Sequence, residues 1–282
     1  TNGAFSYTAT DTGSGVSYLQ YKKPGSSSWL SYTSGTTIAS TATNGQYQFR
    51  AVDKAGNVSD TQTIYLDSAA PTGTIKNSSG TAISGYTGGA FSYTATDTGS
   101  GVSYLQYKTP GSSSWTTYSS GTTISASATN GLYQFRAVDN AGNTSAVSSI
   151  YLDTAIPTGR ITDSNGTTVT TTTNKAFKYT ASDGLSGIAY MQYKKPNSTV
   201  WETYAAGTLI QTTDTNGIYR FRAFDNAGNE SETVMICLDT VKPTGTLYGG
   251  TSTVASGGKT NANYVKFVPS DSMSGIKSIY VQ

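Results

Sequence analysis

The chain has 282 residues, of which only 12% are charged, and a formal net charge of +2. Charged residues make up about a quarter of an ordinary globular domain, so hydroxyl and amide groups must make this surface polar. The basic residues are scattered, which argues against nucleic-acid binding. No apolar run reaches the ~20 residues of a membrane-spanning helix. There is no histidine, which argues against any Cys–His or Ser–His nucleophile.

An internal repeat organises the chain. The stretch GAFSYTATDTGSGVSYLQYK occupies residues 3–22 and again residues 89–108, so the period is 86 residues. Each unit opens with Pro-Thr-Gly and closes with Leu-Asp, and only three residues separate that Asp from the next Pro. We therefore predict four parts in a segment of a longer array: a repeat lacking its first strand (1–70), two full repeats (71–156 and 157–242), and the opening part of a further, truncated repeat (243–282).

Seven short strands are predicted in the second repeat from alternation and turn residues. Phe91 and Tyr93 in the second strand, and Tyr133 and Phe135 in the sixth, are expected to face the core. No segment shows a period of 3.6 residues, so the pattern favours an all-β antiparallel sandwich. The predicted strands, in chain order, are 72–76, 90–97, 102–108, 115–118, 122–125, 132–139 and 148–153.

These residues resemble the immunoglobulin-like (Ig-like) tandem repeats of large bacterial cell-surface proteins and adhesins. The resemblance covers the whole chain and rests on DTGSGV at 97–102, on NGLYQFRAVDNAGN at 130–143 and on LDTAIPTG at 152–159. It implies tandem seven-stranded Ig-like β-sandwiches in an elongated rod. Tyr47, Tyr133 and Tyr219 match the corner tyrosine of such folds. Phe49, Phe135 and Phe221 stand where many of these folds have a disulfide cysteine, so aromatic packing is expected to close the core.

Acidic charge is nearly confined to three repeated positions. The strand order places Asp97 and Asp139 at the end of the sandwich that the linker residue Asp67 enters, and the next repeat places Asp183 and Asp225 beside Asp153. Carboxylate oxygens are the ligands that Ca²⁺ prefers. Two interpretations stay open: calcium sites at the junctions between repeats, formed by these six residues, and plain capping of turns, which aspartate commonly provides. No other cofactor is expected.

The sequence gives less support to a reactive cysteine, a catalytic carboxylate pair, an isopeptide bond or a sugar-binding platform. Cys237 replaces the aromatic residue found at positions 65 and 151, so we expect it to pack rather than react. A catalytic pair of carboxylates or a self-formed isopeptide bond would need features that the repeats do not share. An aromatic platform for sugar could be built from Tyr104, Tyr107, Trp115 and Tyr118, but a role in the core is the favoured interpretation.

The sequence thus predicts a non-enzymatic structural segment of an extracellular bacterial surface or secreted protein. Such a segment would act as a stalk or spacer, or would assemble into a filament or surface layer with other copies. The alternatives are a module that binds glycan or host protein, and a phage appendage. The expected partners are neighbouring repeats, other copies in a filament or surface layer, and a surface glycan, without nucleic acid.

Overall fold

The computed structural model describes residues 1–280. The chain divides into two compact units, Thr1–Thr154 and Ala155–Gln282. Every regular element in residues 1–280 is a β-strand, and there is accordingly no helix among them that could span a membrane. The protein is all-β and built of tandem β-sandwich domains. The predicted domain boundaries stay a prediction, and "repeat 1", "repeat 2" and "repeat 3" below denote residues 1–70, 71–156 and 157–242.

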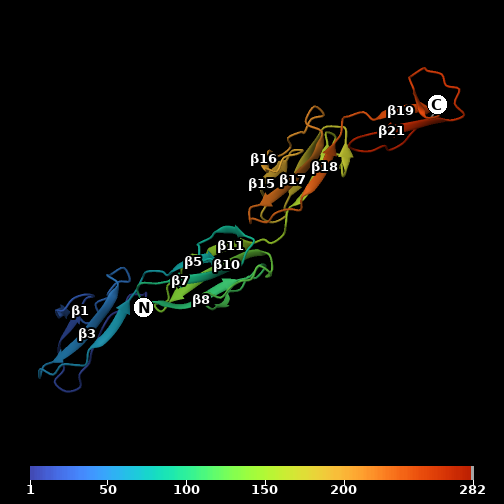
Figure 1. The fold of residues 1–282 in the computed structure, drawn as a ribbon. Coiled ribbons are helices and arrows are strands. Elements are labelled where there is room, and N and C mark those ends of the chain that lie inside the picture. The colour runs from blue at the N-terminus through green and yellow to red at the C-terminus, as the bar shows by residue number, and fades with distance from the viewer. Residues whose placement is uncertain (281–282) are drawn as a thin grey trace. The chain divides into compact units, whose positions relative to one another are not determined.

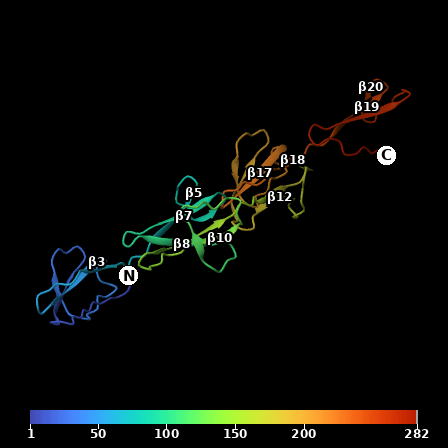
Figure 2. The same cartoon turned by 90° about the horizontal axis from the view of Figure 1, so that it is seen from below.

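Repeat 2 shows the sandwich most completely (Figures 1 and 2). One sheet has two strands, β5 (Thr72–Asn77) and β7 (Phe91–Thr96), which pair antiparallel. The other sheet has the order β6-β11-β10-β8-β9. Its strands are β6 (Gly85–Thr87), β8 (Val102–Lys108), β9 (Thr116–Tyr118), β10 (Gly131–Asp139) and β11 (Ser148–Leu152).

Repeat 3 has the same arrangement. A sheet of two strands, β12 (Thr158–Asp163) and β14 (Phe177–Ser182), faces a sheet of order β13-β18-β17-β15-β16. The strands of that sheet are β13 (Thr172–Thr173), β15 (Ile188–Lys194), β16 (Glu202–Tyr204), β17 (Gly217–Asp225) and β18 (Val234–Leu238).

The remaining strands repeat parts of this pattern. Repeat 1 has one four-stranded sheet of order β2-β1-β3-β4, made of β1 (Val16–Lys22), β2 (Leu30–Tyr32), β3 (Gly45–Asp53) and β4 (Gln62–Leu66). Residues 243–280 contain β19 (Thr244–Gly249), β20 (Ser252–Val254) and β21 (Val265–Ser270) in one sheet.

Two predictions about the core are confirmed. The hydroxyl of Tyr133 donates to the carbonyl of Thr129 at 3.0 Å, as a corner tyrosine should, and Tyr47 and Tyr219 make the equivalent bond. Phe135 is fully buried and its ring contacts those of Tyr93 and Tyr118 at centroid distances of 5.0 and 5.2 Å. Aromatic packing therefore closes the sandwich, with ring pairs that each add about 0.5–1.5 kcal/mol beyond their buried area.

One predicted strand is wrong. Residues 122–125 form no strand; a single bridge joins Ile124 to Phe91. The repeat still has seven strands, because an unpredicted strand, β6, lies between the predicted first and second strands. Its three residues pair parallel with β11. A strand this short, read as GYT, carries too little alternation to stand out from its turn-rich surroundings.

The Pro-Thr-Gly motif has a steric reason. A Cβ atom on Gly73 would lie 1.8 Å from the hydroxyl oxygen of Tyr93, and one on Gly159 would lie 2.1 Å from that of Tyr179. Each tyrosine lies across the backbone of the first strand, where only glycine leaves room. A Cβ on Gly245 would likewise meet the ring of Phe267 at 2.2 Å. The motif therefore recurs because the aromatic residue of the opposing strand recurs.

Candidate functional site at the junction of repeats 1 and 2

Three aspartates converge where the linker enters repeat 2. Asp67 directly follows β4, Asp97 directly follows β7, and Asp139 ends β10. One carboxylate oxygen from each lies within 4.8 Å of the others, and Asp67 and Asp139 are buried. The structure therefore brings together the first three residues that the sequence placed at a junction.

Two of these carboxylates cap their own turns. The Oδ2 atom of Asp97 accepts hydrogen bonds from the amides of Gly99 and Gly101 at 3.0 and 2.7 Å. The Oδ1 atom of Asp139 accepts from the amides of Ala141 and Asn143 at 2.9 and 2.7 Å. Turn capping is therefore a role that both residues fulfil in the structure.

The same turns are capped in repeat 1. Asp11 accepts from the amide of Gly15 at 2.7 Å, and Asp53 accepts from the amide and side chain of Asn57 at 2.7 and 2.8 Å. The side-chain hydrogen bond from Asn57 is the main influence that holds the pKa of Asp53 below its ordinary value. Capping at these two turn positions is therefore common to repeats 1 and 2.

Asp67 is different, because it joins the linker to the next repeat. Its Oδ2 atom accepts a hydrogen bond from the amide of Ser100 at 2.6 Å, and its main-chain carbonyl accepts one from Nδ2 of Asn143 at 2.8 Å. Its Oδ1 atom accepts from the amide of Ala69 at 3.0 Å, which fixes the linker itself. One residue therefore connects the last strand of repeat 1 to two separate turns of repeat 2.

Hydrogen bonding keeps the Asp67 carboxylate ionised. Burial by itself raises its pKa, but the hydroxyl and amide of Ser100 and the amide of Ala69 outweigh burial and hold the pKa below its ordinary value. Among residues 1–280 no Lys or Arg forms an ion pair with any of the three carboxylates. Main-chain and side-chain dipoles therefore hold the negative charge that gathers at the junction, and the N-terminal ammonium group also lowers the pKa of Asp67.

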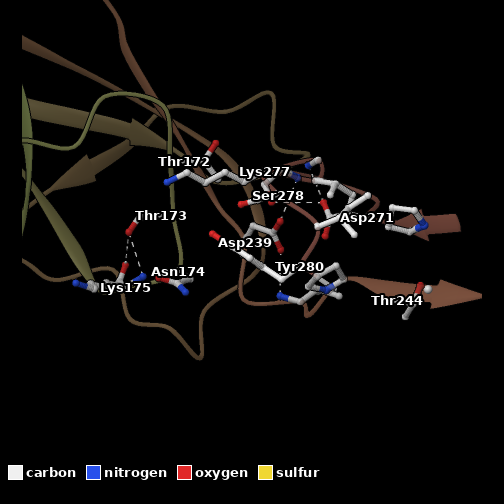
Figure 3. A pocket seen from close by; sticks show the side chains of 18 of the residues that line it. Thr172, Thr173, Asn174, Lys175, Asp239, Thr244, Asp271, Lys277, Ser278 and Tyr280 are labelled. Carbon is white, nitrogen blue, oxygen red and sulfur yellow. Dashed lines mark hydrogen bonds between the residues drawn. The ribbon is translucent and has the colours of Figure 1, made fainter. Parts of the chain in front are cut away.

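The second unit contains an equivalent of the Asp67 linkage. Asp239 directly follows β18, and its Oδ2 atom accepts a hydrogen bond from the amide of Ser274 at 3.0 Å while its Oδ1 atom accepts from Val241 at 3.0 Å. Asp271 caps the turn that contains Ser274, as Asp97 caps the turn that contains Ser100. Figure 3 shows Asp239 and Asp271 in the pocket that these segments line.

This pocket of about 1130 Å³ lies beside the exposed face of the sheet that contains β19 and β21. Phe267 is 48% exposed there, whereas its counterpart Tyr179 in repeat 3 is fully buried. Within residues 243–280 no second sheet covers β19 and β21. The pocket is therefore a face that the full repeats bury.

The other three predicted calcium ligands belong to different units, with Asp153 in the first unit and Asp183 and Asp225 in the second. Asp153 follows β11 in the first unit, where its amide donates to the carbonyl of Thr87 at 2.9 Å. Asp183 and Asp225 lie in the second unit with carboxylate oxygens within 4.8 Å of each other. They cap turns through Gly187 at 2.8 Å and Asn229 at 2.8 Å. A calcium site at these three residues stays a prediction.

The donor set at Asp67, Asp97 and Asp139 fits a calcium ion. It offers oxygen ligands from three carboxylates, which is the ligand type that Ca²⁺ prefers. Three carboxylates at one place also repel one another unless a proton or a cation is shared between them. The chemistry of the site is therefore compatible with Ca²⁺ as well as with the capping that the hydrogen bonds display.

The four aromatic residues considered as a sugar platform do not form one surface. Tyr118 is buried, and Tyr107 packs against the core of repeat 2. Trp115 lies on the opposite, outer side of the sheet, close to Arg136 and Lys108. Tyr104 is exposed. The predicted role in the core is therefore confirmed for Tyr107 and Tyr118 and is wrong for Tyr104 and Trp115.

Residues 5–68 match the family model of the bacterial Ig-like domain. By this match, residues 5–68 are similar to bacterial Ig-like domains. The 86-residue repetition and the shared strand pattern extend that similarity to the repeats that follow. Bacterial Ig-like domains are typically found on extracellular or surface proteins and are generally not catalytic.

Solved structures with similar folds are distant. The fibronectin(III)-like modules of Clostridium thermocellum CbhA match with 18% identity over 58% of this chain and 92% of theirs, at a TM-score of 0.31. Domains FN1–FN3 of chicken CNTN1 match with 15% identity over 78% and 88%, at 0.28. Bacteroides ovatus SGBP-B, solved with a mixed-linkage heptasaccharide, matches with 13% identity over 86% and 65%, at 0.18. No curated protein matches the chain.

Sequence reasoning missed the residues that hold Asp67. Ser100 and Asn143 lie in motifs that recur in every full repeat, and the serine recurs at positions 14, 186 and 274. That recurrence was the feature of the sequence that could have identified them. Because both residues belong to turns, their recurrence is equally expected for turn formation, and only the structure reveals that they reach the preceding linker.

Proposed function

We propose that this array of bacterial Ig-like repeats is a non-enzymatic stalk or spacer of a bacterial cell-surface or secreted protein. The observation that supports it is the Asp67 linkage, in which one linker residue bonds to Ser100 and Asn143 of the next repeat. A linker fixed in this way transmits orientation from one domain to the next. Stability of such an array is approximately the sum of the stabilities of its repeats and of their interfaces.

We further propose that Asp67, Asp97 and Asp139 hold a calcium ion when calcium is present. Bound calcium would neutralise the three carboxylates and add ligand bonds between the linker and two turns. The surrounding amides orient the carboxylates, and Asn143 holds both Asp67 and Asp139 through its side chain. Calcium would strengthen a junction that hydrogen bonds already define.

The spacer function can be tested by measuring the distance distribution between repeats 1 and 2. Spin labels at the exposed positions Ser27 and Ser113, in a chain carrying Cys237→Ser, report this distance by double electron–electron resonance. We expect a narrow distribution that Asp67→Ala broadens. A broad distribution in the unaltered chain would contradict an orienting spacer. A host-protein-binding module and a phage appendage stay predictions from the sequence.

A further inference from the structure

A cluster of cations and one tryptophan occupies the outer face of the larger sheet in repeat 2. On β8, the side chains of Gln106 and Lys108 point away from the core, opposite to the buried Leu105. Arg136 lies across from Gln106 in the register of β10, and its Nε donates to Oε1 of Gln106 at 2.8 Å. The guanidinium and the Lys108 ammonium lie 4.4 and 4.9 Å from the centre of the Trp115 ring.

The same outer cluster is built in the other repeats. In repeat 1 the indole of Trp29 lies 4.1 Å from the Arg50 guanidinium and 4.8 Å from the Lys22 ammonium. In repeat 3 the corresponding distances from Trp201 are 4.2 Å to Arg222 and 4.8 Å to Lys194. Each contact of this kind holds a flexible cation in a defined place at the surface.

Only repeat 3 supplies a counter-charge to this cluster, because Glu230 forms an ion pair with Arg222 at 2.7 Å. The other ion pair, between Glu202 and Lys195 at 2.9 Å, involves neither Arg222 nor Lys194. The equivalent positions in repeat 2 are Thr144 and Thr116, and those in repeat 1 are Val58 and Leu30. Within residues 1–280 these are the two ion pairs of the structure, so the clustered cations of repeats 1 and 2 have no carboxylate partner there.

The acidic groups of repeat 2 lie elsewhere. Asp97 and Asp139 are turned into the junction, where they accept amide hydrogen bonds. Charge is therefore separated along the domain, with carboxylates at one end of the sandwich and cations on the outer face of the sheet. Two fixed cations without a counter-charge complement an anion outside the chain.

We propose that the outer sheet faces of repeats 1 and 2 bind a linear polysaccharide that carries carboxylate or sulfate groups. Arg50 and Arg136 each offer the planar fork that binds carboxylate or sulfate through two hydrogen bonds. The neighbouring Tyr104 is 46% exposed and presents a ring and a hydroxyl to a sugar. The spacing favours a glycan over nucleic acid, because double-stranded DNA carries a charge about every 1.7 Å and calls for a denser basic surface.

Retention of the complete chain on immobilised polygalacturonate tests this proposal. We expect retention at low salt that weakens at least about tenfold in the double variant Arg50→Gln, Arg136→Gln. The matched control is Lys54→Gln, Lys76→Gln, which removes the same charge from a turn and from the other sheet. Equal losses in the two variants, with unfolding temperatures unchanged in both, would overturn the proposal.

Repeat 3 offers a gain-of-binding test. The variant Glu230→Thr gives it the residue that repeat 2 has at this position, and we expect stronger retention because Arg222 loses its counter-charge. Glu232→Thr, which removes a carboxylate that pairs with neither cation, should change retention less. A neutral mixed-linkage glucan should retain none of these proteins. Tighter binding to duplex DNA than to polygalacturonate at equal salt would contradict a glycan as the partner.

Discussion

The Oδ2 atom of Asp67 lies 2.6 Å from the amide nitrogen of Ser100, which places a side chain of the linker in the turn after β7 of the following repeat. Asp239 and Ser274 repeat the relationship at 3.0 Å in the second unit. The two bonds join residues 33 and 35 positions apart. Because the same bond is made twice in one chain, it is a property of the repeat and not of one local sequence. It makes the linker part of the domain that follows it.

Removing the Asp67 carboxylate should destabilise the junction. Asp67→Ala removes the charged acceptor of the part-buried hydrogen bonds from the amides of Ser100 and Ala69, at a cost of about 1–3 kcal/mol. For domains of this size, each kcal/mol corresponds to about 4–8 °C in unfolding temperature. Calorimetry of the chain should show a lower midpoint, whereas Asp60→Ala, which removes an exposed carboxylate from the same repeat, should leave it unchanged. Equal midpoints for the two variants would contradict the linkage.

Calcium should raise the unfolding temperature of the chain relative to a chelator. Ligand binding to the folded state alone stabilises it by about 2.7 kcal/mol at one hundred times the dissociation constant. Asp139→Asn should abolish the response, because it removes one of the three converging carboxylates. Asp53→Asn, which alters the same turn in repeat 1, is the matched control and should retain it. An unfolding temperature that is the same with calcium and with a chelator would contradict a calcium site and show that these residues only cap turns.

Acidification should weaken the chain below about pH 4. Amide hydrogen bonds hold the pKa of Asp67 and Asp183 below the ordinary value, even though burial acts in the opposite direction. A carboxylate with a lowered folded-state pKa contributes stability that is fully present above its unfolded pKa of about 3.9 and is lost as the pH falls through the folded value. Urea unfolding in chelator should therefore give constant stability from about pH 7 to pH 5. Stability that rises on acidification to pH 3 would contradict a stabilising role for these ionised carboxylates.

Gly73→Ala should destabilise repeat 2 by about 1–3 kcal/mol, the usual range for overpacking a core. The new methyl group would lie 1.8 Å from the Tyr93 hydroxyl. Gly89→Ala is a suitable control, because the nearest atom to its Cβ would be 3.9 Å away. Urea unfolding of both variants measures the difference. A Gly73→Ala variant as stable as Gly89→Ala would show that Tyr93 moves aside at little cost.

Tyr93→Phe should leave the stability of repeat 2 unchanged or raise it. The Tyr93 hydroxyl is buried and has no hydrogen-bond partner among the described residues. Removing a buried polar group without a partner relieves its desolvation cost. Urea unfolding measures the change, and a loss of more than about 1 kcal/mol would reveal a hydrogen bond that the structure does not contain.

Much of the fold could be predicted because the same strand and turn pattern recurs in each repeat of the sequence. The alternation in 91–96 and 132–138 identified the buried faces, with Phe91, Tyr93 and Phe135 in the core. Strand β6 could not be predicted, because three residues give no periodicity and its partner residues in β11 are 65 positions away in sequence (Gly85 pairs with Ile150). Pairing of that kind depends on tertiary structure, not on local propensity.

The candidate site was predictable in its carboxylates but not in its partners. Strand order alone places Asp97 and Asp139 at the end of the sandwich that Asp67 enters. The donors to Asp67 are the amide of Ser100 and the side chain of Asn143, and a main-chain amide carries no signal in sequence. Whether an aspartate caps its own turn or accepts from another domain depends on the path of the linker, which the sequence does not specify.

The most direct test of the central claim is hydrogen exchange at the amide of Ser100, measured by NMR in the complete chain. If Asp67 joins the two repeats, this amide is protected in the unaltered protein. Protection should disappear in Asp67→Ala while the amides of β10 in the same repeat keep theirs. Rapid exchange of Ser100 in the unaltered protein, or protection that survives Asp67→Ala, would contradict a junction organised by this residue.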